Sequence, residues 1–179
     1  MMALLVAASM LIFASKYLAV VLYKNSFYSA WMVGCILIFA FVFNSLSSLI
    51  GTIYTATKKT SVLFYSTLAA ACVNIALNII LIPCYGLYGA AFATLVSYVC
   101  VWLIRALLAK KQMEKGFIDR NSLIILVLIA FQIVIELSSL EYKMFLSFVI
   151  VLLVIAAAYK KLRNSILYDK ITTIIERRK

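Results

Sequence analysis

Histidine is absent from this chain of 179 residues, proline occurs once, and only six acidic residues accompany 17 basic ones. Without histidine, the chain cannot hold a Ser/His/Asp or Cys/His nucleophilic site or a histidine-ligated metal. It also lacks the glycine-rich sequences of a P-loop and of a dinucleotide-binding turn. The four cysteines have no metal-ligand spacing, so we expect them to be small packing residues. The sequence therefore predicts a protein that is not an enzyme and needs no cofactor or metal.

Long apolar runs dominate what remains. Hydrophobic residues make up 66% of the chain and the mean hydropathy is +1.11, which is too apolar for a water-soluble core of this size. A membrane-spanning helix needs about 20 predominantly apolar residues. The sequence predicts an all-α, polytopic membrane bundle in which residues 1–160 form a lobe of six transmembrane helices. The predicted spans are residues 3–22, 30–50, 62–82, 87–109, 123–140 and 144–159.

Basic residues gather at alternate gaps between these spans. Lys58 and Lys59 follow the second span, a larger group surrounds the end of the fourth, and another follows the sixth. Such a bias marks the cytoplasmic side of a membrane protein, so we expect both termini of the segment to be cytoplasmic. The same distribution explains the net charge of +11 without a nucleic-acid partner. We expect residues 161–179 to form a basic amphipathic helix that lies on the anionic cytoplasmic leaflet.

Polar side chains recur on single faces of the second and third spans. They can form hydrogen bonds between helices, or they can line a hydrophilic cavity that meets water or sugar hydroxyls. We favour the cavity, because two rows on neighbouring helices exceed what helix packing alone requires. One row is Asn44, Ser48 and Thr52, and the other is Thr67, Asn74 and Asn78.

Three ionisable residues fall within or near the spans. Lys16 lies six residues, or ~9 Å, from the end of the first span, so it either faces a polar cavity or extends to the headgroups. In a cavity its ammonium group would favour an anionic ligand such as a phosphate or pyrophosphate. Arg105 and Glu136 are each four residues from a span end, and we expect both to reach the interface. The alternative for Glu136 is a coupling proton or ion.

A hairpin between the third and fourth spans carries the most specific sequence pattern. ATKKT begins at Ala56, and Asn74-x-x-x-Asn78 leads into IILIP, which ends at Pro83. A tight turn and the run YGLYGAAFATLVSY follow, from Tyr85 to Tyr98. This pattern resembles the C-terminal half of bacterial polysaccharide flippases. These are the O-antigen and capsule translocases of the MATE-like multidrug/oligosaccharidyl-lipid/polysaccharide exporter superfamily. The resemblance is specific over residues 51–105 and weak in the last two spans.

The resemblance implies an inner-membrane transporter of two pseudo-symmetric six-helix lobes around a central cavity. Such a protein moves undecaprenyl-pyrophosphate-linked oligosaccharide to the periplasmic leaflet by alternating access, coupled to an ion gradient. Lys16 would then meet the pyrophosphate, while Asn44, Asn74 and Asn78 would line the cavity or join the helices. The implied partners are the lipid bilayer, the lipid-linked substrate, an N-terminal lobe or a second copy, and polysaccharide polymerase and glycosyltransferases.

Other interpretations remain open. The chain can be half of a multidrug/cation antiporter of the same superfamily, but such proteins need a cation-attracting cavity, and the inner helices offer Lys16 instead of a carboxylate. It can also be a scaffold subunit that packs against a glycosyltransferase or polymerase, which predicts no water-filled cavity. The chain starts inside a predicted helix, so we expect a truncated sequence, although a split gene or an assembly of two copies would also supply the second lobe.

Overall fold

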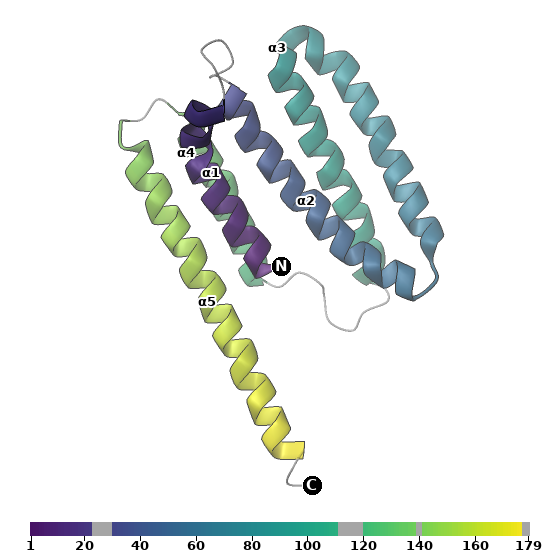
Figure 1. Cartoon of the computed structure of the whole chain (residues 1–179). Coiled ribbons are helices and arrows are strands. Elements are labelled where there is room, and N and C mark those ends of the chain that lie inside the picture. Colours follow the sequence, from purple (N-terminus) through teal and green to yellow (C-terminus); the bar gives the residue numbers. More distant parts are fainter. Residues whose placement is uncertain (23–29, 111–119, 139–140, 177–179) are drawn as a thin grey trace.

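The computed structural model describes residues 1–22, 30–110, 120–138 and 141–176, with side chains for 1–21, 31–109, 121–138 and 141–163. Its regular structure there is entirely helical, which confirms the predicted all-α class. Helices are expected in lipid because each satisfies its own backbone hydrogen bonds without water. The helices are α1 (Met2–Leu22), α2 (Ala30–Ala56), α3 (Thr60–Lys110), α4 (Arg120–Leu137) and α5 (Lys143–Glu176) (Figure 1).

Four of these helices, α1, α2, α3 and α5, are long and apolar enough to cross a membrane, while α4 is a shorter apolar helix. The predicted spans fall inside these helices except the segment 123–140, because α4 ends at Leu137. The backbone also shows no break at the predicted lobe boundary, since α5 runs continuously from Lys143 to Glu176. The predicted amphipathic face of residues 161–179 depends on side chains that the structure describes only as far as residue 163, so it stays a prediction.

Helix α3 is a hairpin of two arms, a first arm (60–85) and a second arm (87–110), which run side by side in Figure 1. The reversal occurs at Gly86, whose backbone (φ 54°, ψ −128°) leaves the helical region and is open mainly to glycine. Gly89 then sits directly against the carbonyl group of Leu81 on the first arm. The predicted turn is therefore confirmed. Gly86 is required by its backbone conformation, and Gly89 by the close approach of the first arm.

The lysine pair forms the turn between α2 and α3. Lys58 adopts a left-handed conformation (φ 57°), and its amide donates to the carbonyl of Thr55 over 3.1 Å. The amide of Lys59 donates to the carbonyl of Tyr54 over 2.8 Å. These two bonds make a Schellman motif, which satisfies the last carbonyls of α2 and allows the chain to reverse. The two basic side chains are thereby held at the end of the bundle.

Helix α2 lies at the centre of the arrangement. It packs against α3 on one side and against α1 and α4 on the other, and α5 joins α1 and α4 to complete the bundle. The N-terminus, the α2–α3 turn, the end of α3 and the C-terminal end of α5 all point to one end of the molecule (Figure 1). Lys58 and Lys59, which form the α2–α3 turn, lie at this end.

Apolar side chains fill the bundle and also cover its outside. Leu5, Ile12, Leu46 and Ile129 are fully or almost fully buried between helices. Equally apolar side chains lie on the outer faces, such as Val21, Ile79, Val127 and Phe145. Lipid tails are as apolar as these residues, so exposed faces of this kind fit a bilayer rather than water.

One polar cluster crosses the interior of the bundle. Gln132 on α4 has no exposed surface, and its side-chain oxygen accepts a 2.7 Å bond from the hydroxyl of Ser9 on α1. Its amide nitrogen donates to the backbone carbonyl of Ser9 (3.0 Å) and to the hydroxyl of Ser147 on α5 (3.1 Å). Gln132 therefore links three helices, α1, α4 and α5, through hydrogen bonds.

Replacing Gln132 with leucine is expected to destabilise the bundle by about 1–3 kcal/mol, since buried hydroxyls then lose their partner. The triple variant Ser9→Ala, Gln132→Leu and Ser147→Ala should recover most of that loss, because no side-chain polar group is left unsatisfied. Reversible unfolding in detergent micelles measures both free energies. Equal instability of the single and triple variants would show instead that the shape of the glutamine matters, and not its bonds.

Candidate functional site

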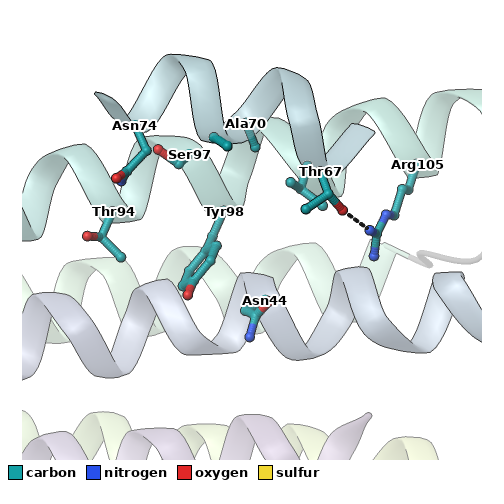
Figure 2. A pocket seen from close by; sticks show the side chains of 10 residues that line it. Asn44, Thr67, Ala70, Asn74, Thr94, Ser97, Tyr98 and Arg105 are labelled. Atoms are coloured by element: carbon teal, nitrogen blue, oxygen red, sulfur yellow. Dashed lines mark hydrogen bonds between the residues drawn. The ribbon is translucent and has the colours of Figure 1, made fainter. Parts of the chain in front are cut away.

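A cavity of about 320 Å³ lies between α2 and the two arms of α3. Its side chains come from all three helical segments, and most of them are polar (Figure 2). Amide, hydroxyl and guanidinium groups all contribute to its wall, and none of the lining residues is acidic. The lining residues are Asn44, Thr67, Ala70, Ala71, Asn74, Thr94, Ser97, Tyr98, Val101 and Arg105.

Arg105, near the end of the second arm, forms hydrogen bonds with both of the other segments that line this cavity. Its guanidinium group donates to the hydroxyls of Ser66 and Thr67 on the first arm, each over 2.9 Å. It also donates to the backbone carbonyl of Ser47 on α2 over 3.2 Å. The expectation that Arg105 extends to the headgroups is therefore wrong, because these acceptors draw the side chain inward across both neighbouring segments (Figure 2).

A second cavity, of about 570 Å³, lies on the side of Arg105 nearer the lysine turn. Ser48, Thr52 and Thr55 of α2 contribute its hydroxyl groups. Each hydroxyl donates to a carbonyl of its own helix, so its oxygen still has the capacity to accept a bond from a ligand. Arg105 lines both cavities and is the group they share.

The two asparagines of the first arm are bonded to each other. The amide nitrogen of Asn78 donates to the side-chain oxygen of Asn74 over 2.9 Å. The side-chain oxygen of Asn78 is buried and has no partner among the described residues. Asn74 is thus held at the cavity wall by the residue one turn further along the arm.

The structure brings together some of the predicted site residues and separates others. Asn44 and Asn74 line the cavity, and Asn78 lies directly behind Asn74. Lys16 is a partly buried residue of α1, which packs on the opposite side of α2 from α3. Glu136 is buried on α4, also away from this cavity. The prediction that it reaches the interface is wrong, because α4 packs with this face against α1, α2 and α5.

Sequence reasoning missed the contribution of the second arm. The residues in question recur at helical spacing, at positions 94, 98, 101 and 105, and this spacing places them on one face. On the adjoining face the small residues Gly89, Ala93 and Ser97 recur every four residues, a pattern typical of close helix packing. Ser97 belongs to both descriptions, since its hydroxyl donates to the carbonyl of Ala93 over 2.6 Å at the edge of the cavity.

The lining suits a ligand that carries hydroxyl or anionic groups. Amides and hydroxyls both donate and accept hydrogen bonds, as sugar hydroxyls do, and a guanidinium group binds phosphate oxygens in pairs. With one positive charge and no carboxylate in the wall, the cavity repels a cation. No protein-family model, no curated protein and no solved structure matches this chain.

Proposed function

We propose that this chain is the C-terminal lobe of a bacterial inner-membrane transporter for undecaprenyl-pyrophosphate-linked oligosaccharide. The observation that carries the proposal is a cavity lined by several polar side chains and by no carboxylate, between helices that are otherwise apolar. Polar groups inside a membrane protein are costly unless they pair or serve a ligand, and here one helix and a hairpin contribute them to one place. The sequence resemblance of residues 51–105 to polysaccharide flippases points to the same substrate class.

The chemistry of the wall fits the two parts of such a substrate. Asn44 and Asn74 offer donors and acceptors to sugar hydroxyls, while Arg105 offers its remaining N–H groups to the pyrophosphate. In this proposal Arg105 takes the role that the resemblance implied for Lys16. At about 320 Å³ the cavity accommodates only part of a lipid-linked oligosaccharide, so a second lobe or a second copy would supply the opposite wall.

The arrangement of the basic residues supports the proposed orientation. The α2–α3 turn, which holds Lys58 and Lys59, lies at the same end of the molecule as the N-terminus and the C-terminal end of α5 (Figure 1). Under the positive-inside rule this end faces the cytoplasm, where the lipid-linked substrate is assembled. The larger cavity lies beside the lysine turn, and so nearer the side from which the substrate would enter.

Two alternatives fit the same features less well. A multidrug/cation antiporter would need a negative group in its cavity, and the buried carboxyl group among the described residues, Glu136, lies on α4 instead. A scaffold subunit predicts that the polar rows serve only contacts between helices, whereas Asn44 and Asn74 border an open volume.

Direct binding separates the three interpretations. The chain in lipid nanodiscs is titrated with undecaprenyl-pyrophosphate-linked oligosaccharide, with undecaprenyl phosphate that carries no sugar, and with tetraphenylphosphonium, a lipophilic cation. We expect the oligosaccharide conjugate to bind most tightly and the cation not to bind. Preference for the cation would favour the antiporter, and binding of none of the three would favour the scaffold.

The variant Asn74→Leu is expected to weaken binding of the oligosaccharide conjugate about tenfold, because a sugar hydroxyl loses a partner worth roughly 1–2 kcal/mol. Binding of undecaprenyl phosphate, which has no sugar, should change little. The matched control is Asn121→Leu, the same replacement at an exposed asparagine on α4. An equal effect of both replacements on the conjugate would contradict a role of the cavity in sugar recognition.

A further inference from the structure

An apolar groove of about 450 Å³ lies between α1 and α5. It extends from Met2 to Met10 on α1 and from Ile155 to Leu162 on α5, and the phenol of Tyr159 is the one polar group among its lining side chains. Alanines on both helices leave the space open between the larger side chains. The groove shares no residue with the two cavities that Arg105 lines, so it is a separate feature of the bundle.

The length of the groove matches the depth of one membrane leaflet. Met2 and Met10 are ~12 Å apart along α1 at a rise of 1.5 Å per residue. One leaflet supplies half of the ~30 Å of hydrocarbon in a bilayer, or ~15 Å. Because the hydrocarbon region holds no water, a groove on its protein surface must be filled by something apolar, either a lipid chain or another helix.

One end of the groove is basic. Leu162 is the last lining residue of α5, and the exposed Arg163 follows it directly. Arg163 also lies one helical turn beyond Tyr159, on the same side of α5 and therefore beside the groove. On the other flank, the ammonium group of Lys161 donates to the hydroxyl of Ser122 on α4 over 3.2 Å. The sequence of α1, and that of α5 as far as Arg163, contains no acidic residue, so the charge at this end is positive.

We propose that this groove binds an anionic diacyl phospholipid, with an acyl chain between α1 and α5 and the phosphate at Arg163. A guanidinium group can bind two phosphate oxygens at once, and basic pockets beside membrane helices are typical sites for anionic headgroups. Tyrosine is enriched at the level of the headgroups, which is where Tyr159 would then lie. An apolar helix would fill the same groove but would give Arg163 no negative partner.

Native mass spectrometry of the chain in detergent micelles tests the proposal, with one lipid added at a time. The probes are phosphatidylglycerol, phosphatidylcholine with the same acyl chains, and undecaprenyl phosphate. We expect phosphatidylglycerol to bind about fivefold more tightly than phosphatidylcholine, because one basic residue near an anionic headgroup contributes about this factor. Undecaprenyl phosphate should bind less tightly than phosphatidylglycerol, since its much longer chain exceeds the depth of the groove. The inference does not depend on which substrate the polar cavity takes.

Two pairs of variants separate the headgroup from the acyl chain. Arg163→Gln should lower the affinity for phosphatidylglycerol about fivefold, to that for phosphatidylcholine. Its matched control is Lys160→Gln, because Lys160 is also exposed but lies on the side of α5 away from the groove. Ala3→Phe fills the groove and should weaken the binding of both phospholipids. Its control is Ala156→Phe, at an exposed alanine of α5 that does not line the groove.

A phosphatidylglycerol with a photoreactive diazirine in its acyl chain locates the site in the unmodified chain in nanodiscs. Cross-links are expected between Met2 and Met10 and between Ile155 and Leu162. Equal affinity for the two phospholipids, or equal effects of Arg163→Gln and Lys160→Gln, would overturn the proposal. Tighter binding of undecaprenyl phosphate would assign the groove to a polyprenyl lipid instead. Cross-links that avoid the groove in a chain that forms dimers would assign it to a helix of a second copy.

Discussion

Replacement of Arg105 by methionine is expected to remove binding of the pyrophosphate-containing ligand and to loosen the contact between α2 and α3. The guanidinium group makes three hydrogen bonds to Ser47, Ser66 and Thr67, which belong to the two segments facing it. Hydrogen bonds between membrane helices average ~0.6 kcal/mol and reach about 1.7. The unfolding free energy should therefore fall by about 2 kcal/mol, and by about 5 kcal/mol at most. Methionine is chosen because it keeps much of the apolar part of the arginine side chain.

The conservative variant Arg105→Lys separates charge from geometry. An ammonium group keeps the positive charge but cannot reach three acceptors on two helices at once. Arg105→Lys should therefore keep part of the ligand affinity that Arg105→Met loses, while its unfolding free energy falls nearly as far. Unfolding in detergent micelles and ligand titration in nanodiscs measure the two effects. Lys160→Met is the matched control, because Lys160 is an exposed cation on α5 that does not line the cavity. If Arg105→Met and Lys160→Met weaken binding equally, the effect is one of general surface charge.

Replacement of Gly89 by alanine is expected to prevent the two arms of α3 from closing. The added Cβ atom would overlap the carbonyl group of Leu81, and a backbone group cannot move aside as the end of a flexible side chain can. Overpacking usually costs 1–3 kcal/mol, and this contact with backbone should lie at or above the upper end of that range. Because Asn74 and Thr94 stand on opposite arms of the hairpin, the cavity should lose its shape as well.

The same replacement at Gly34 is the control. A Cβ atom there meets nothing within 4 Å, and alanine favours a helix by up to about 1 kcal/mol over glycine. Gly34→Ala should therefore leave stability unchanged or raise it, while Gly89→Ala lowers both stability and ligand binding. Unfolding curves in micelles and binding titrations of the two variants compare these effects directly. Equal stability of the two variants would show that the hairpin tolerates a wider bend.

Much of the architecture could be predicted because membrane helices carry local signals. Long apolar runs can be stable in lipid only as helices, and Gly86 follows the single proline at the point where the apolar run must turn back. The charge bias at alternate gaps likewise needs no knowledge of the tertiary structure. The polar faces of α2 and of the first arm could be identified as well, since helical period alone puts Asn74 and Asn78 on one side.

The positions of the ionisable groups could not be predicted in this way. Distance from a span end suggested that Arg105 and Glu136 would both reach the interface, yet the partners of Arg105 lie 38 to 58 residues away in sequence. Gln132 and Ser9 are separated by 123 residues. Because lipid-facing and buried surfaces are equally apolar in this chain, composition does not indicate which face of a helix turns inward.

The sequence by itself therefore determined an all-helical membrane chain, a hairpin closed at Gly86 and a basic end. These features follow from the local rules of hydrogen bonding in lipid, backbone freedom at glycine and charge placement. Only the tertiary structure decided that Arg105 joins Asn44 and Asn74 around a cavity while Lys16 and Glu136 stay apart from it. The physical reason is that helical period fixes the faces of one helix, whereas packing between helices far apart in sequence fixes which faces meet.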